Sequence, residues 1–196
     1  MLTGKNFIGN KLSSLGDVTF QTFNPELNKK NDQIFYEANN DEINESLDLA
    51  KNAFEDYKKT TPNERSKFLN SIADEISFIS DTLLEVYCSE TGLPAGRSRG
   101  ELKRTIGQLR SFADLVLDGS WVEASIDTAI PDREPIPKPD LRKMMIPLGP
   151  VVVFGASNFP LAYSTAGGDT ASALAAGCPF IVKSHPMHAG PGEIVA

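Results

Sequence analysis

A bend of small residues after a short apolar run is the most chemically suggestive stretch of this sequence. In VVVFGASNFPLAYSTAGG, residues 151–168, the run leads into Gly155, and Asn158 supplies a carboxamide before Pro160 restricts the backbone. The two N–H donors of a carboxamide could stabilise a developing oxyanion. The same side chain could instead cap a helix beginning near Pro160, because Asn is a preferred N-cap residue. The local sequence leaves both roles equally open.

Lys183 is the second residue with a chemical role to consider. It ends the apolar run CPFIVK and is followed by Ser184, His185 and Pro186. A lysine at the end of a strand, beside a phosphate or a ribose, offers a mobile positive charge with three donors. An ordinary solvated lysine is the alternative, and it is the commoner situation in proteins.

The remaining reactive side chains favour structural roles. His185 and His188 have no Cys or carboxylate partner at zinc spacing, so no metal site is predicted. Cys88 has Glu90 nearby, and a neighbouring carboxylate disfavours the thiolate. Cys178 opens an apolar run, which suits a packed thiol better than a nucleophile. Neither a G-x-G-x-x-G nor a Walker pattern occurs in the sequence.

Three amphipathic helices are expected ahead of the bend. The first begins at Asn39, where the spacing to Glu42 allows a capping box. The second begins at Thr61, with a proline at its first helical position and Glu64 at the spacing of a capping box, and continues to Gly92. The third covers roughly residues 97–117, with its apolar side chains on one stripe.

Short extended segments surround these helices. Residues 7–8 and 18–23 are expected to form a small N-terminal strand pair across a turn. Prolines across residues 121–139 exclude a helix interior and a central strand, so a long surface connection is expected there. The run LRKMMIP that follows can form an edge strand.

The last part of the sequence has the pattern of a parallel sheet. Residues 151–154 and 178–183 are predicted to be buried parallel strands, joined by a helix of small residues over 161–176. Open α/β sheets bind ligands at the carboxyl ends of such strands. The Asn158 bend and Lys183 are therefore expected at one ligand-binding edge.

Composition and charge narrow the class of protein. The 196 residues carry a net charge of −7, which disfavours binding to a nucleic-acid backbone. No apolar run is long enough to span a bilayer, and residues 1–12 lack the apolar region of a signal peptide. A cytoplasmic protein with two reduced cysteines and no membrane partner is expected.

Several segments, in their order and spacing, resemble the N-terminal portion of the NAD(P)-dependent aldehyde dehydrogenase superfamily. They are ETGLP, IPLGPVVVFGASNFP and ALAAGCPFIVKSHP, and the resemblance covers essentially the whole chain. The FGASNFP bend and KSHP look like the branch that oxidises 2-oxoglutarate semialdehyde (2,5-dioxopentanoate). The resemblance implies an α/β fold with an incomplete Rossmann-like doubly wound parallel sheet, N-terminal strands and an oligomerisation hairpin.

The resemblance also implies roles for individual residues. Asn158 matches the oxyanion-hole asparagine of the family, and this match favours the catalytic role of Asn158 over the capping role. Cofactor-binding positions are implied at Phe154, Gly155, Ala156, Ser157, Lys183, Ser184 and His185. Pro186 stands where many NAD-preferring relatives have a glutamate, and this favours NADP over NAD.

The implied domains are N-terminal strands and helices (1–126), an oligomerisation hairpin (127–146) and the start of a nucleotide-binding βαβ core (147–196). The catalytic cysteine and the glutamate base are expected outside this chain, in a catalytic domain that it lacks. The expected whole protein is a homo-oligomer, a dimer or a tetramer, that oxidises a small aldehyde to a carboxylate. The alternative is a non-catalytic fragment that only binds a nucleotide.

Overall fold

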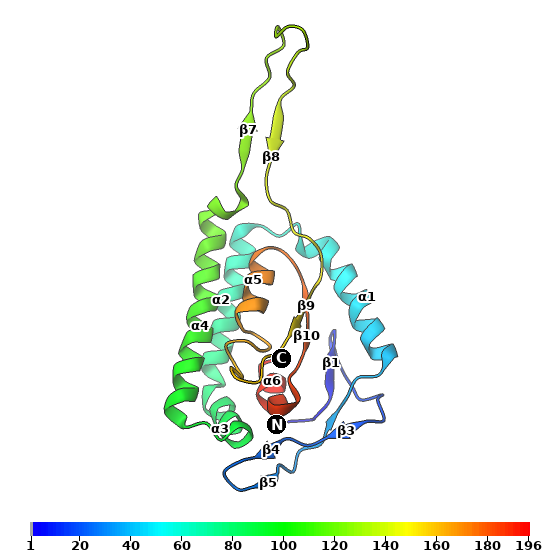
Figure 1. Ribbon diagram of the computed structural model, residues 1–196, viewed down its shortest axis with the longest axis vertical. Helices are drawn as coiled ribbons and strands as arrows, with labels where there is room; N and C mark the ends of the chain where they lie inside the picture. Colours follow the sequence, from blue (N-terminus) through cyan, green and yellow to red (C-terminus); the bar gives the residue numbers. More distant parts are fainter. Residues whose placement is uncertain (1) are drawn as a thin grey trace.

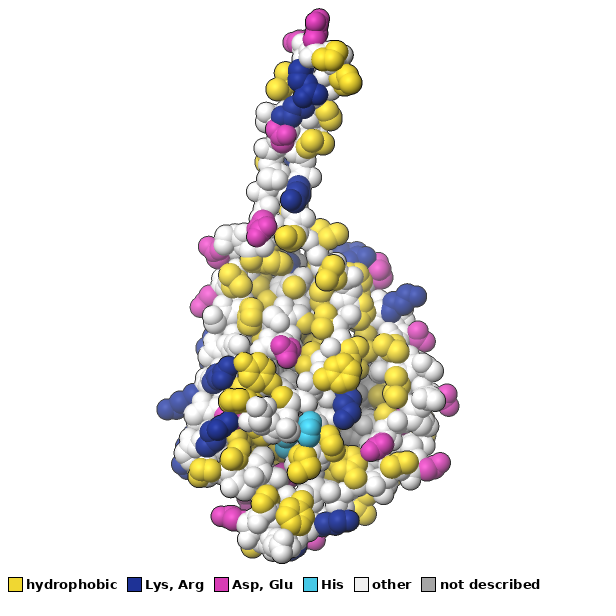
Figure 2. Space-filling view, viewed as in Figure 1, with side chains coloured by type: hydrophobic (Ala, Val, Ile, Leu, Met, Phe, Trp, Pro, Cys, Tyr) yellow, Lys and Arg dark blue, Asp and Glu magenta, His cyan; other side chains and the backbone are white. Residues whose placement is uncertain are grey.

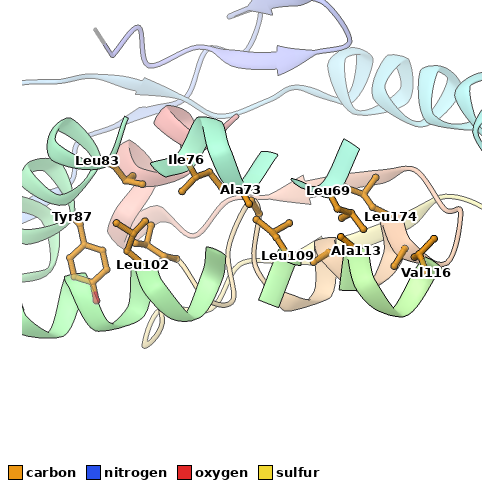
Figure 3. Close-up of a cluster of buried hydrophobic side chains, with 14 residues drawn as sticks. Leu69, Ala73, Ile76, Leu83, Tyr87, Leu102, Leu109, Ala113, Val116 and Leu174 are labelled. Atoms are coloured by element: carbon orange, nitrogen blue, oxygen red, sulfur yellow. The ribbon is translucent and has the colours of Figure 1, made fainter. Parts of the chain in front are cut away.

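Two long helices, α2 (Pro62–Phe78) and α4 (Ala95–Asp118), lie side by side along one side of the computed structural model, which describes residues 2–196 (Figure 1). Helix α5 (Gly168–Ala175) packs against both of them. Buried apolar side chains meet in the α2–α4 interface, as Figure 3 shows; they are Leu69, Ala73, Ile76, Leu102, Leu109, Ala113 and Val116.

The helix starts follow the sequence signals. A capping box forms at Asn39 ahead of α1 (Asn40–Tyr57), and a second one forms at Thr61 ahead of α2. Both boxes were predicted, and both are confirmed. The expected third helix is also confirmed, as α4, whose C-cap is a left-handed Gly119.

The second expected helix is wrong in one respect, because it is two helices. The chain breaks at Ile79, and α3 (Ser80–Thr91) then continues to a left-handed Gly92. The ψ of Ile79 is 7°, outside the α-helical range, so the axis changes direction there. The new direction allows Leu83 and Tyr87 of α3 to be completely buried in the core.

The N-terminal strands pair differently from the expectation. Gly9, with a φ of 58°, turns the chain so that residues 6–8 pair with the strand directly after them instead of with residues 18–23. The antiparallel pairs are β1 (Asn6–Ile8) with β2 (Lys11–Ser13), β3 (Thr19–Phe20) with β6 (Phe35–Tyr36), and β4 (Phe23–Asn24) with β5 (Lys29–Lys30).

The two strands β9 (Val151–Phe154) and β10 (Phe180–Lys183) are parallel, as predicted, and α5 forms part of their crossover. The predicted burial is wrong for Val152 and Phe154, which are exposed among residues 2–196. The helix expected over 161–176 is shorter, because it begins only at Gly168. Residues 161–167 are turns, and the N–H of Gly168 donates to the carbonyl of Ala162. A Cβ on Gly167 would collide with that same carbonyl, so the tight turn requires glycine.

A two-stranded arm projects from the body of the molecule (Figure 1). It is built on β7 (Ser125–Asp127) and β8 (Leu141–Lys143), which pair antiparallel after the short helix η1 (Ser120–Val122). The expected strand at LRKMMIP is therefore present, paired within the arm. Hydrophobic side chains lie exposed along it (Figure 2); they include Ile126, Ile130, Ile136, Leu141 and Met144.

The last elements are η2 (Pro186–His188) and α6 (Ala189–Val195), which packs against α3. Glu193 of α6 binds the N-terminal segment, since its carboxylate accepts the N–H groups of Thr3 and Gly4 at 2.6 and 2.9 Å. Across residues 2–196, none of the helices combines the length and the apolar character that a membrane span needs.

Candidate functional site

The carboxyl ends of β9 and β10 bring the two chemical candidates of the sequence together. Phe154 pairs with Lys183 in the parallel register, and the N–H of Gly155 donates to the carbonyl of Lys183 at 3.0 Å. A Cβ on Gly155 would lie 3.2 Å from the backbone nitrogen of His185, so glycine permits the close approach of the two chain segments. The Asn158 bend and Lys183 therefore share one edge of the sheet.

Asn158 lies exposed on the bend, and its side chain caps no helix. The nearest helix, α5, begins ten residues later with Gly167 as its N-cap. Among the hydrogen bonds of residues 2–196, none involves the carboxamide of Asn158; only its backbone carbonyl is engaged, by Arg97 at 3.2 Å. The capping role considered from the sequence is therefore wrong, and both N–H donors are free to meet a ligand.

A buried carboxylate fixes the chain immediately after Asn158. Glu101 of α4 is only 4% exposed, and its Oε1 accepts the N–H groups of Leu161 and Ala162 at 2.8 and 3.0 Å. Its Oε2 accepts the hydroxyl of Tyr87 at 2.8 Å. Burial, together with this carboxylate, raises the pKa of Tyr87, so the hydroxyl keeps its proton and remains a donor. Together with the bond from the N–H of Gly168 to the carbonyl of Ala162, the bonds to Glu101 hold residues 161–167 in turns.

A buried histidine fixes the chain just before Asn158. Nε2 of His188 lies 2.6 Å from the carbonyl oxygen of Ala156. Because a carbonyl can only accept, Nε2 carries the hydrogen in this pair. Burial lowers the pKa of His188 and so favours the neutral ring, whose Nδ1 then has a buried lone pair with no partner within residues 2–196. The ring also stacks on His185, with 5.3 Å between centroids.

Sequence reasoning missed the positioning roles of Glu101 and His188. The signal for Glu101 was present, since residues 101, 105, 109 and 113 form one buried stripe of α4 with Leu109 and Ala113 in it. A carboxylate on such a stripe needs donors to satisfy it. For His188 the sequence offers no comparable signal, because its partner is a backbone carbonyl of a distant turn.

Some of the other residues singled out from the sequence lie at this edge of the sheet, and others lie away from it. Ser184 lies at the edge, and its Oγ is buried without a partner within residues 2–196. Cys178 precedes β10, at the opposite end of the strand from Lys183, and Cys88 lies half-buried on α3, 3.6 Å from Ser98 Oγ. No cluster of three or more potential metal ligands occurs among residues 2–196.

The sequence profile of the aldehyde dehydrogenase family matches residues 13–194. An α-ketoglutaric semialdehyde dehydrogenase of Azospirillum brasilense is 49% identical over 99% of this chain, and one of Acinetobacter baylyi is 45% identical over 98%. The chain spans 37% of the length of each of these relatives.

Solved structures show the same fold at low sequence identity. A betaine aldehyde dehydrogenase of Staphylococcus aureus, solved with NAD⁺, gives a TM-score of 0.85 at 22% identity, over 100% of this chain and 38% of the other. A succinate-semialdehyde dehydrogenase of Burkholderia pseudomallei gives 0.78 at 23% identity, over 97% of this chain and 37% of the other. The predicted α/β fold class is thereby confirmed.

Proposed function

The chain belongs to the aldehyde dehydrogenase family, and from this premise we propose that the full-length protein oxidises 2-oxoglutarate semialdehyde to 2-oxoglutarate. The two relatives at 49% and 45% identity, which carry that activity in their names, support this choice of substrate. The observation that carries the proposal is the free carboxamide of Asn158, held at the sheet edge between two backbone tethers.

Asn158 would act on the substrate carbonyl. Its side-chain N–H donates to the oxygen as negative charge develops during nucleophilic attack, and the tethers at Ala156 and Leu161 keep the donor in place before the reaction. Both cysteines of this chain lie away from the edge. We therefore assign the attacking thiolate, and the glutamate that activates water for hydrolysis of the thioester, to parts of the protein outside these 196 residues.

The residues at the edge fit a nicotinamide dinucleotide. Gly155 lets the backbone approach closely, Lys183 offers an exposed positive charge, and the buried Oγ of Ser184 lacks a partner within residues 2–196. When bound, NAD(P) would accept the hydride from the substrate. In this assignment Phe154 to Ser157 line the cofactor, and Lys183, Ser184 and His185 hold its ribose side. Because Pro186 replaces a carboxylate, we assign NADP as the preferred form.

The arm and the cellular location complete the proposal. The exposed apolar side chains of the arm support its role as the hairpin, residues 127–146, that joins subunits of a homo-oligomer.

The cytoplasm is the proposed compartment, since residues 2–196 contain two free cysteines and form no membrane-spanning helix.

An Asn158→Ala variant of the full-length enzyme tests the proposed function. Removal of one oxyanion donor is expected to lower kcat roughly 10²- to 10³-fold while leaving NADP affinity unchanged. Wild-type turnover should also be faster with NADP than with NAD. Full activity of the variant would refute the role of Asn158. A protein that binds NADP but oxidises no aldehyde would favour the alternative, a nucleotide-binding module.

A further inference from the structure

An open hollow lies beside Asn158, on the side of α4. Its volume is about 330 Å³, within the usual range for small-molecule sites. Its wall is formed by Gly96, Arg97, Gly100, Glu101, Arg104 and Phe159. Phe159 directly follows Asn158, so the hollow adjoins the proposed oxyanion donor.

Two arginines on the same face of α4 supply the positive charge of this hollow. The guanidinium groups of Arg97 and Arg104 lie 4.8 and 5.5 Å from the ring centroid of Phe159. Arg97 also donates to the carbonyl of Asn158 and lies 3.8 Å from the carboxylate of Glu101, which partly neutralises it. Arg104 forms no ion pair with a carboxylate of residues 2–196. The positive charge of the hollow is therefore centred on Arg104.

The guanidinium of Arg104 is already oriented. It donates to the hydroxyl of Tyr163 at 2.8 Å and lies 5.2 Å from the centroid of that ring. Stacking on two aromatic rings restricts the long side chain, and one hydrogen bond leaves the other N–H groups of the fork available. Such a planar fork suits two-point binding of a carboxylate.

Two glycines keep the hollow open. Gly96 and Gly100 lie one turn apart on α4, and a Cβ at either position would meet no atom within 4 Å. Neither packing nor backbone conformation therefore requires glycine there, although glycine favours a helix less than alanine does. Open space on the face that carries the arginines is the property that these glycines provide.

We infer that Arg104, assisted by Arg97, binds the carboxylate of the substrate and selects acidic semialdehydes over neutral aldehydes. This inference rests on the proposed function, since the oxyanion donor Asn158 marks where the aldehyde end of the substrate lies. The carboxylate end then lies across Phe159, one residue away. The substrate of the proposed function has an aldehyde at one end and a carboxylate at the other, one for each of these two groups.

The test compares Arg104→Met with wild type in the full-length enzyme, using 2-oxoglutarate semialdehyde and pentanal, a neutral aldehyde of the same chain length. The variant should lose roughly 10- to 100-fold in kcat/KM for the acidic substrate, as expected for one charge-assisted hydrogen-bonded contact. Its kcat/KM for pentanal should change by about 2-fold or less. Arg104→Lys, which keeps the charge and loses the fork, should fall between the two enzymes.

Arg110→Met is the matched control, because Arg110 is on the same helix but pairs with Asp74 at 2.7 Å. It should leave the selectivity for the acidic substrate unchanged. An equal loss for both aldehydes in Arg104→Met, or no loss for either, would overturn the inference.

A binding measurement separates this inference from the proposed function. Calorimetric titration with 2-oxoglutarate should show weaker binding to Arg104→Met than to wild type, whether or not the protein oxidises any aldehyde. Gly100→Val should weaken the same binding by filling the hollow, without lowering the Tm. Unchanged affinity in both variants would refute the anion site even in an active enzyme.

Discussion

The α2–α4 interface and the loop around Asn158 lie next to each other but are held together by opposite kinds of interaction. Between the helices, apolar side chains such as Leu69 and Leu109 are completely buried, and many small contacts share the stabilisation. The loop is held by a few polar bonds, from Glu101 and His188 to its backbone. We therefore expect substitutions in the core mainly to lower the free energy of unfolding. Loss of a single polar bond to the loop should mainly lower turnover.

The largest loss of stability is expected from Leu109→Ala, which tests the packed side of this comparison. The side chain is 0% exposed at the α2–α4 interface, so truncation removes buried area and leaves a cavity. The expected cost is about 2–5 kcal/mol in the free energy of unfolding. Denaturant unfolding of the full-length enzyme measures this cost.

The surviving folded fraction of Leu109→Ala should retain wild-type kcat, because the tethers of the loop are intact. Leu117→Ala is the control, since that leucine of the same helix is 52% exposed and should cost much less. A lower kcat in folded Leu109→Ala would show that the core and the loop are not independent.

Glu101→Met tests the polar side of the comparison. The substitution leaves the N–H groups of Leu161 and Ala162 and the hydroxyl of Tyr87 without their acceptor. One buried donor left unsatisfied costs about 1–3 kcal/mol. The loop that carries Asn158 should relax, so the loss in kcat, expressed as a free energy, should exceed the loss in the free energy of unfolding. The KM for the cofactor should change little.

Glu101→Gln is the matched variant for this experiment. Its Oε1 can still accept both loop N–H groups, while its amide can donate to the Tyr87 hydroxyl. Most of the turnover should therefore return. If Gln and Met behaved alike, the negative charge of Glu101, and not its hydrogen bonding, would be the property that matters.

The same contrast explains which features the sequence could predict. The capping boxes and the α4 stripe were predictable because they rest on residues three or four positions apart. The helix expected over 161–176 begins only at Gly168, because the carbonyl of Ala162 accepts the N–H of Gly168 and Glu101, some 60 residues earlier, holds the N–H groups of Leu161 and Ala162 in a turn. Tertiary contacts of this kind have no local signal. For the same reason, Asn158 and Lys183 could be identified as candidates, while the backbone groups of the bend that Glu101 and His188 contact could not.

A pH effect is expected from Glu90, another buried carboxyl. It accepts the Thr22 hydroxyl at 2.9 Å and the N–H of Gly190 at 3.0 Å, and burial raises its pKa to about 7, with Glu193 contributing further. Since the unfolded value is 4.5, the folded state holds this proton more tightly. The stabilisation from Glu90 is complete below pH 4.5 and is lost as the pH rises to about 7.

The expected loss is at most about 3 kcal/mol, because the pKa shifts from 4.5 to about 7 and one pKa unit corresponds to about 1.4 kcal/mol. Glu90→Gln cannot ionise and should remove this part of the pH dependence. Unfolding curves at intervals between pH 5 and 8 compare the two proteins. Parallel curves for wild type and variant would contradict the assignment of this proton to Glu90.

The smallest expected effect concerns a helix start that was predicted correctly from neighbouring residues, the cap at Thr61. Its hydroxyl accepts the N–H of Glu64 at 3.3 Å, and the Glu64 carboxylate accepts the N–H of Thr61 at 2.7 Å. Thr61→Ala should destabilise the protein by about 1 kcal/mol, whereas Thr61→Ser, which keeps the hydroxyl, should cost much less. Neither variant should alter kcat, because Thr61 lies at the start of α2, which packs against α4 and α5 through the apolar core. A change in turnover with Thr61→Ala would mean that helix ends, as well as the tethers at Glu101 and His188, set the position of the Asn158 loop.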